Sequence, residues 1–561
     1  MTCTTIAKDL KNSMHDFTLL NKFFMATRPR DGKSPNPATI RRRVKSLLQT
    51  ATEEGQLKQN MRQLVSFTGM DNFLPPQYSK FQKVVKEGLI YFLSELPISR
   101  LAAKIADQLR LPHTASAGRR MTTLVKDMPT LQKLGQIICR SPGLDPDLKQ
   151  VLTDLEDNLK TVTFRQLQPM IKRQLKSQNA SVSVQLNGEI LAEATVSAVI
   201  PARIESPDDS ARYPGVLKII KPAVRRHLPG ELDIWDRLGD YLDMNKDQWD
   251  LDDFSFKGTI DQVRYLLENE IDLSSEQRNL DAVRDYYASS EDIVIPDRLD
   301  VSTPLMTAMA RVDGNKITDV AHLTAKQRRQ LAGALVDTCI LRPVQELNRQ
   351  SFFHGDPHAG NLAYSFNGKL PRIILYDWAM TGQLSRLERF AIMLLTAGLV
   401  THSRKAIYYA ADMIAGGQIS SDKQMSRDIK RMIKQVLAAR NERFNGIFST
   451  VEHLFEQCTY HGIVFTADIL MFEKALVTLK GVVADIDPTF NRDEYLIWAA
   501  LATLIGDFLQ LRFHKLIVEE IWDLYRHSIA RLIEIQKFLF RFMWDLGQAY
   551  ALAPRPAMVT Q

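Results

Sequence analysis

The spacing of hydrophobic positions changes along the chain and separates helical from strand-bearing parts. From residue 1 to about residue 115, apolar side chains recur at helical intervals, most clearly over residues 81–93. Residues 116–170 continue this helical pattern. The first third of the chain is therefore predicted to consist of helices.

A period of two replaces the helical spacing near residue 180. Val182, Val184 and Leu186 alternate with polar residues and are followed by the turn pair Asn187-Gly188, which is typical of a strand entering a hairpin. The hydrophobic pattern also predicts further strands and one helix in this part of the chain. The strands are expected at residues 196–204, 216–220 and 305–310, and the helix at residues 261–283.

A second strand-bearing segment follows a long helix predicted at residues 325–349. Between Asn361 and Asp377 the pattern predicts a hairpin that turns at Asn367-Gly368. From residue 384 onward, almost everything is predicted to be helical. A small sheet, a helix, a hairpin and then a helical half indicate an α+β fold with two lobes.

Composition and charge restrict the function. The 561 residues exceed what one core needs, and the net charge of +7 suits a phosphate ligand or an anionic membrane surface. No basic run is interleaved with aromatic residues, so nucleic acid is not an expected partner. The four cysteines form no CxxC pair, which favours a reducing compartment.

The N-terminus carries too many charged residues for a signal peptide, and no apolar stretch reaches the ~20 residues of a membrane span. We therefore expect a cytoplasmic protein, at most peripheral on a membrane, without a transmembrane helix. Apolar and aromatic residues at helical intervals over residues 517–546 could form a membrane-surface helix or, as we favour, a helix packed on the core.

The segment from Phe353 to Asn361 is the most informative in the chain. His354, Asp356 and Asn361 fit the form H-x-D-x-x-x-x-N, which in kinases sets an aspartate beside the nucleophile and an asparagine on a metal ion. Asp377 ends the following hairpin and supplies a second hard oxygen ligand. We therefore expect ATP and Mg²⁺ as ligands, with Asn361 and Asp377 holding the metal.

Two other interpretations of this segment remain open. It could be a loop of turn-forming residues in which Asp356 caps a helix. Alternatively, His354, Asp356 and His358 could bind a transition metal, although Pro357 and Gly360 favour a loop, and no further histidine cluster completes the ligand set.

The segment resembles the H-x-D-P-H-x-G-N signature of the UbiB (AarF) family of atypical, protein-kinase-like kinases. Aminoglycoside and choline phosphotransferases carry a similar loop, and other segments favour UbiB. Residues 133–136 match the K-x-G-Q motif, residues 191–199 are similar to the family's Ala-rich loop, and residues 270–272 match its E-x-D motif.

The resemblance implies a role for several residues of the nucleotide site. Lys218 would bind the α and β phosphates and pair with Glu276, and Asp356 would orient the nucleophile. Ala192 and Ala194 would let the backbone approach the phosphates, in place of a Gly-rich loop.

The K-x-G-Q and E-x-D motifs are expected to meet each other. The resemblance implies that Glu270 and Asp272 contact Lys133, with Gln136 on the same helix. On one continuous helix, Asp272 and Glu276 would share a face and Glu270 would not. The resemblance also implies a helical extension laid across the nucleotide cleft, which would occlude the site for protein substrates.

The resemblance and the pattern together predict five parts. They are a helical N-terminal region 1–115, a K-x-G-Q extension 116–170, a kinase-like N-lobe 171–310, a C-lobe catalytic core 311–400 and a helical C-terminal region 401–561.

The sequence departs from the family pattern at three places. The D-F-G triad becomes Asp377-Trp378-Ala379, so the hinge glycine is lost; Ala359 replaces a proline; and Glu193 adds a charge to the Ala-rich loop that could repel phosphate. The expected function is an atypical kinase or ATPase that supports isoprenoid quinone or related lipid metabolism. The alternatives are a non-catalytic, nucleotide-gated protein that binds a lipid or protein, and a small-molecule phosphotransferase.

Overall fold

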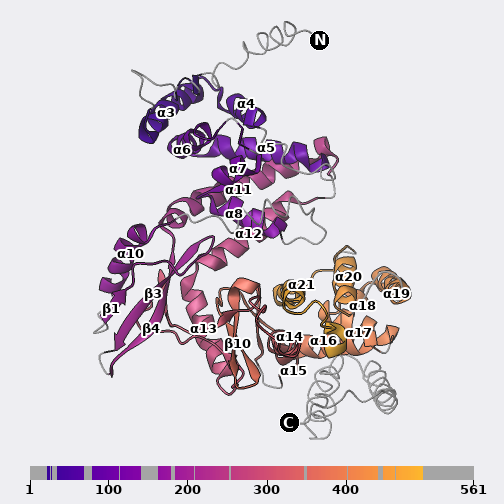
Figure 1. Ribbon diagram of the computed structural model, residues 1–561. Coiled ribbons are helices and arrows are strands. Elements are labelled where there is room, and N and C mark those ends of the chain that lie inside the picture. The colour runs from indigo at the N-terminus through magenta and orange to yellow at the C-terminus, as the bar shows by residue number, and fades with distance from the viewer. Residues whose placement is uncertain are drawn as a thin grey trace. The chain divides into compact units, whose positions relative to one another are not determined.

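A computed structural model of the chain is drawn in Figure 1. It describes residues 22–23, 25, 27, 35–68, 79–112, 114–115, 117–139, 162–177, 183–206, 209–251, 254–346, 350–400, 402–439, 447–460 and 463–496. The chain forms two compact units. The first comprises Met1–Ser274 and Leu299–Ala310, and the second comprises Ser275–Arg298 and Arg311–Gln561.

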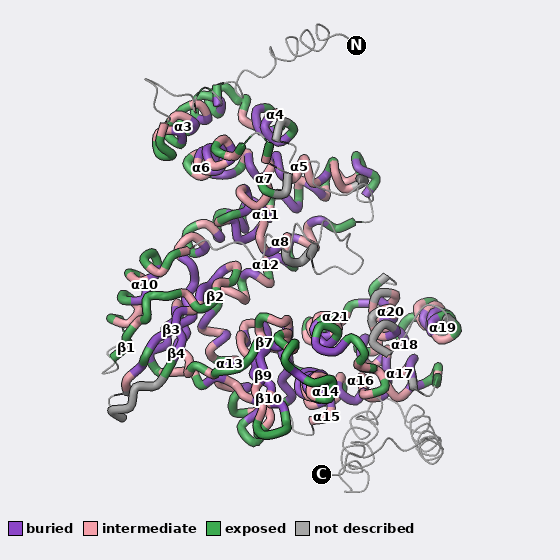
Figure 2. The backbone as a smooth tube through the Cα atoms, in the orientation of Figure 1, coloured by how far each residue is buried: buried purple, intermediate pink, exposed green. Residues whose placement is uncertain are grey.

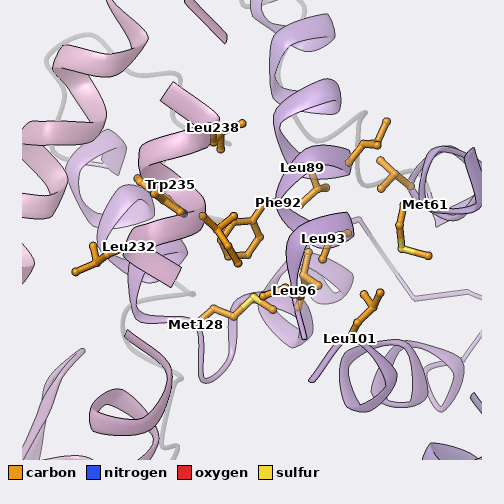
Figure 3. Packing of buried hydrophobic residues seen from close by; sticks show 14 of the residues in the cluster. Met61, Leu89, Phe92, Leu93, Leu96, Leu101, Met128, Leu232, Trp235 and Leu238 are labelled. Atoms are coloured by element: carbon orange, nitrogen blue, oxygen red, sulfur yellow. The ribbon is translucent and has the colours of Figure 1, made fainter. Parts of the chain in front are cut away.

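Helices make up most of the first unit. They are α3 (Pro37–Glu53), α4 (Leu57–Thr68), α5 (Ser79–Glu95), α6 (Ile98–Leu109), α7 (Ala117–Val125), α8 (Pro129–Cys139), α10 (Phe164–Ser177), α11 (Pro222–Asn245), the short η3 (Lys246–Trp249) and α12 (Phe256–Ile271). One apolar core joins the N-terminal helices to α11 and α12. Figure 3 shows Phe92 and Leu93 of α5 in this core, with Leu232 and Trp235 of α11.

The sheet of the first unit is antiparallel, with the order β1-β3-β4-β6 and β2 paired to β3. Its strands are β1 (Ser183–Leu186), β2 (Ala192–Glu193), β3 (Ser197–Ser206), β4 (Asp209–Ile220) and β6 (Met306–Ala310). Leu167 and Ile171 of α10 pack against its inner residues, among them Ile200 and Leu217. The buried centre of this sheet and the exposed side of α10 are visible in Figure 2. The strands predicted in this region are confirmed.

The prediction of one helix over residues 261–283 was wrong. α12 ends at Ile271, Asp272 has a non-helical ψ of 76°, and α13 (Leu273–Tyr287) begins immediately afterwards. The apolar spacing continues through the break, so the hydrophobic pattern alone did not reveal it. Because the helix is interrupted at Asp272, the argument that Asp272 and Glu276 share one helical face fails.

The second unit contains α13 and a small sheet of order β5-β10-β9-β7, in which β5 pairs parallel to β10 and the other pairs are antiparallel. A separate antiparallel pair joins β8 to β11. The strands are β5 (Ile293–Val294), β7 (Asn315–Lys316), β8 (Phe352–His354), β9 (Leu362–Asn367), β10 (Leu370–Leu375) and β11 (Thr381–Gln383).

Helices complete the second unit. They are α14 (Ala325–Val336), the π-helical η4 (Asp337–Leu341), α15 (Arg342–Gln345), the 3-10 turn η5 (Ala359–Asn361), α16 (Arg386–Val400), α17 (Arg404–Ile414), α18 (Gln418–Ser421), α19 (Lys423–Ala439), α20 (Ile447–Tyr460) and α21 (Ala467–Ile486). The helix predicted at 325–349 is therefore shorter and interrupted. Pro343 has no N–H to donate to the carbonyl of Cys339, and the π-turn immediately precedes it.

The predicted α+β fold, with its small, largely antiparallel sheets and its helical half, is confirmed. Across the part of the chain that the structure describes, no helix is both long enough and apolar enough to cross a membrane. The C-terminal pattern at residues 517–546 lies outside the described residues. The division into five parts stays a prediction.

Candidate functional site

The catalytic-loop segment begins at the end of β8, where His354 is completely buried. Its Nε2 lies 2.8 Å from the carbonyl oxygen of Tyr376, and its Nδ1 accepts a hydrogen bond of 3.2 Å from the backbone N–H of Asp356. Burial lowers the pKa of His354, so the ring is neutral and Nε2 carries the proton that Tyr376 accepts. His354 therefore ties the loop to the end of β10.

This geometry excludes the transition-metal interpretation for His354, because both ring nitrogens already face backbone groups. His358 uses Nδ1 to accept the N–H of Gly360, which closes the turn before Asn361. Within the described ranges, no group of three or more histidine, cysteine, aspartate and glutamate side chains is arranged to hold a metal ion.

Asp356 follows in the loop with a mostly buried side chain. The side-chain amide of Asn361 donates a 3.2 Å hydrogen bond to its backbone carbonyl. Two cationic or potentially cationic groups approach its carboxylate: Lys474 Nζ at 3.6 Å from Oδ1, and His358 Nε2 at 4.0 Å from Oδ2. The hydrogen bonds of the loop backbone thus fix the position of Asp356, and the ammonium group of Lys474 lies beside its carboxylate.

The hairpin β9–β10 brings Asn361 and Asp377 to the same end. Leu362 is paired with Leu375 in the sheet register, and the N–H of Tyr376 donates 2.9 Å to the carbonyl of Asn361. Asn361 precedes one strand and Asp377 follows the other, so their positions flank the same edge of the hairpin. Asp377 has φ +56°, a left-handed conformation that aspartate tolerates better than most residues.

The donor set at this edge fits Mg²⁺. The Nδ2 of Asn361 is engaged by the carbonyl of Asp356, which turns the amide oxygen Oδ1 to the other side. Asp377 contributes a carboxylate, of which Oδ1 accepts a 3.3 Å bond from the N–H of Ala379. One carboxylate and one amide oxygen, completed by water and phosphate oxygens, form the ligand type that Mg²⁺ prefers.

The segment after Asp377 is tightly held. The indole of Trp378 is 1% exposed and lies 4.8 Å, centroid to centroid, from the ring of His354. Its carbonyl accepts hydrogen bonds of 3.0 Å from Asn279 of α13 and from Thr381. The buried ring and the two hydrogen bonds to the carbonyl oppose a movement of this segment. Ala379, which stands in place of the hinge glycine, restricts the backbone in the same sense.

Lys218 and Glu276 lie in different units. Lys218 is a buried residue of β4, paired with Val199 on one side and Thr307 on the other. Glu276 lies in the first turn of α13 and is also buried. Their pairing stays a prediction.

The Ala-rich loop contains an ion pair that the sequence did not reveal. Ala192 is paired with Val199 in the short strand β2, and the N–H of Ala194 donates 2.9 Å to the carbonyl of Ser197. Between them, the carboxylate of Glu193 lies 2.8 Å from Lys221 Nζ, and both side chains are less than a tenth exposed. The negative charge of Glu193, which the sequence analysis considered as one that could repel phosphate, is therefore paired with a buried lysine.

The structure brings the K-x-G-Q and E-x-D segments together. Lys133 of α8 forms an ion pair with Glu270 near the end of α12. Asp272 is the residue at which α12 ends. Gln136 lies in α8, and its side chain is not among those described.

Two lysines that pair with candidate site or loop residues escaped the sequence analysis. Lys474 lies on α21 and reaches Asp356 from far along the chain, and Lys221 pairs with Glu193. Neither belongs to a motif. A single lysine in a helix or at a strand end carries no signal of its own, so only the fold could identify these two residues.

Comparisons with known proteins show a similarity to one family over part of the chain. The model of the ABC1 atypical kinase-like domain matches residues 154–411. Among relatives, "Probable protein kinase UbiB" of Cellvibrio japonicus is 23% identical over 81% of this chain and 80% of its own length. The chloroplast protein "ACTIVITY OF BC1 COMPLEX KINASE 3" of Arabidopsis thaliana is 25% identical over 65% of this chain and 50% of its own length.

A second "Probable protein kinase UbiB", from Xanthomonas campestris, is 23% identical over 74% of this chain and 73% of its own length. A solved complex of a Mycobacterium tuberculosis protein with erythromycin aligns at a TM-score of 0.39 and 17% identity, over 58% of this chain and 82% of that one. At that TM-score it supports no argument about the fold. Residues 154–411 therefore match the model of the ABC1 atypical kinase-like domain, and the resemblance to the UbiB/AarF proteins that the motifs indicated is confirmed.

Proposed function

We propose that the chain binds Mg-ATP and transfers or hydrolyses its terminal phosphoryl group. The observation that carries this proposal is the edge of the β9–β10 hairpin, where Asp356, Asn361 and Asp377 are held by the hydrogen bonds of one loop and one strand pair. A triphosphate needs a divalent cation to neutralise its charge, and these residues combine a metal-binding pair with a separate carboxylate.

In this proposal each residue has one task. Asn361 and Asp377 would hold Mg²⁺, which supplies charge neutralisation on the phosphates. Asp356 would orient the attacking hydroxyl or water and accept its proton. As the nucleophile's oxygen bonds to the γ-phosphorus, the bond from that phosphorus to the β–γ bridging oxygen breaks and ADP leaves.

The remaining nucleotide contacts are proposed from the family resemblance alone. By the family resemblance, we propose that Lys218 binds the α and β phosphates with Glu276 as its partner. Ala192 and Ala194 would lie along the phosphates. The K-x-G-Q residues Lys133 and Gln136, with Glu270 and Asp272, would hold the helical extension that, by the family resemblance, occludes the site for protein substrates.

The acceptor would be water or a small molecule. The resemblance to the UbiB family implies a role in isoprenoid quinone metabolism, so a quinone precursor or related isoprenoid lipid is the acceptor class that we propose first. Peripheral contact with a membrane would give access to such a lipid.

The test uses the purified full chain with Mg-ATP. We expect nucleotide binding in the wild type, with turnover lost by at least about a hundredfold in Asp356→Asn, because the base is removed, and nucleotide affinity lost in Asp377→Asn, because a metal ligand is removed. Asp313→Asn serves as the control, since Asp313 is an exposed residue paired with Arg311. Unchanged turnover in Asp356→Asn would contradict the assigned role.

A second candidate function is a nucleotide-gated binding protein without catalysis. The buried Trp378 and the hydrogen bonds to its carbonyl favour it, because they fix the segment that carries Asp377. Stabilisation by Mg-ATP without release of phosphate, with and without lipid vesicles, would support this candidate and reject turnover.

A further inference from the structure

Helix α21 lies directly against the catalytic-loop segment. The N–H of Gln383 in β11 donates 3.0 Å to Asp468, and the rings of Phe353 and Phe472 meet edge to face at 5.2 Å between centroids. A Cβ placed on Gly355 would collide with the side chain of Met471. These contacts come from one side of the helix, so α21 packs against the loop. The packing fixes the position of the residues that follow on the helix relative to the loop.

Lys474 follows on the same helix and points its ammonium group at the catalytic carboxylate. Its Nζ lies 3.6 Å from Asp356 Oδ1 and 3.8 Å from the sulfur of Met380, and about a third of its side chain remains exposed. A thioether accepts hydrogen bonds weakly, whereas an ammonium carries three donors. The group is therefore positioned by a carboxylate and a sulfur, and its side chain remains partly accessible to solvent.

The catalytic loop itself supplies little positive charge. Between Asp356 and Asn361 the sequence contains no lysine or arginine, and His358 is the only residue that could become a cation. In phosphoryl transfer, negative charge spreads over the three equatorial oxygens of the transferred group, and a cation placed there stabilises it. The helix α21 provides such a cation beside the residue that would face the nucleophile.

We propose that Lys474 is a further catalytic residue, which binds the terminal phosphoryl group of the nucleotide during transfer. This proposal rests on the proposed function, because it assumes that Asp356 faces the γ-phosphate. It assigns to the C-terminal half a direct part in the chemistry, which none of the motifs indicated. A Lys474 that only holds Asp356 in place would affect turnover alone, whereas a phosphate-binding Lys474 also distinguishes ATP from ADP.

The experiment compares Mg-ATP and Mg-ADP affinities of the full chain with those of Lys474→Met and Lys474→Arg. We expect Lys474→Met to weaken Mg-ATP binding about tenfold, because a charge-assisted contact to the terminal phosphate is lost, and to leave Mg-ADP binding within about twofold. Lys474→Arg keeps the charge and should recover most of the ATP preference. Lys480→Met removes a lysine from the same helix and should match the wild type.

Equal losses for ATP and ADP, or no loss for either, in Lys474→Met would overturn the assignment of Lys474 while leaving the proposed function intact. A wild-type chain that binds neither nucleotide would overturn the proposed function and this assignment together. Thermal unfolding of each variant monitors folding. Should Lys474→Met unfold, Lys474→Gln keeps a polar side chain and must show the same selective loss of ATP affinity.

Discussion

The buried ion pair of Glu193 and Lys221 shows how the first unit accepts a charged residue in its Ala-rich loop. Burial lowers the pKa of Lys221, and the carboxylate of Glu193 opposes that effect. Burying two charges costs free energy of desolvation, and the attraction between the two side chains offsets this cost only while both are present. The Ala-rich loop is therefore anchored by an ion pair in which removal of either side chain leaves the other buried without the opposite charge that pairs with it.

Glu193→Gln should lower the free energy of unfolding by about 3 kcal/mol at pH 7, because it leaves the Lys221 ammonium buried without its carboxylate. The pKa of Lys221 is already below its ordinary value, and the substitution lowers it further. As the pH rises through this lowered pKa, the folded variant loses the buried charge before the unfolded chain does. The deficit relative to the wild type should therefore shrink toward about pH 10.

Denaturant unfolding of both chains at several pH values measures this. Lys221→Met combined with Glu193→Gln should recover most of the stability, since no unpaired charge remains. A deficit that is the same at every pH, or a double variant that is additive, would contradict the pairing.

At the scale of elements, the sequence predicted the individual strands correctly but missed where one helix ends and the next begins. The strands of the first sheet and the hairpin between Asn361 and Asp377 follow from alternation and turn residues, which are properties of neighbouring residues. The break at Asp272 was not predictable, because the apolar spacing runs through it while the backbone leaves the helical conformation at this one residue.

The same limit applies to the candidate site. Asp356 and Asn361 belong to one loop motif and Asp377 ends the hairpin that follows, so the sequence predicted that Asn361 and Asp377 flank the same edge of this hairpin. Lys474 could not, since it reaches Asp356 only because α21 packs on β8 and β11. A packing contact between distant segments leaves no mark in a single sequence.

The contact between Gly355 and α21 offers a test at this scale. A Cβ at residue 355 would meet the side chain of Met471 and would lie 3.1 Å from the carbonyl oxygen of Met380. Gly355→Ala should therefore displace α21 from the loop, cost about 1–3 kcal/mol of stability, and reduce turnover more than it reduces nucleotide affinity.

Met471→Ala supplies the space that the new methyl group needs, because the obstructing atoms belong to a flexible side chain. The double variant Gly355→Ala, Met471→Ala should recover stability beyond either single change, as measured by thermal unfolding. Gly481→Ala is the control, since a Cβ at this glycine of α21 would meet nothing within 4 Å. Full activity in Gly355→Ala would show that α21 does not support the loop.

At the scale of the whole molecule, the N-terminal helices are part of the first unit's core. Phe92 and Leu101 of α5 and α6 belong to the same apolar cluster as Leu232 and Trp235 of α11. Buried hydrogen bonds reinforce this core, since Glu231 of α11 forms an ion pair with Arg100 of α6 and accepts the N–H of Thr130 at 3.0 Å. The described helices within the predicted region 1–115 therefore share one apolar core with α11 and α12.

A chain lacking residues 1–115 should therefore fail to fold its first unit. The apolar face of α11 would be exposed, with Leu232 and Trp235 at its centre, and Glu231 would lose its arginine. Exposed apolar surface of this extent drives aggregation. We expect aggregated or molten material by size exclusion and dye binding. A truncated chain that stays monomeric and binds Mg-ATP like the wild type would show that the first unit does not need these helices.

The single change Phe92→Ala in the full chain should cost about 3–5 kcal/mol while leaving a folded protein.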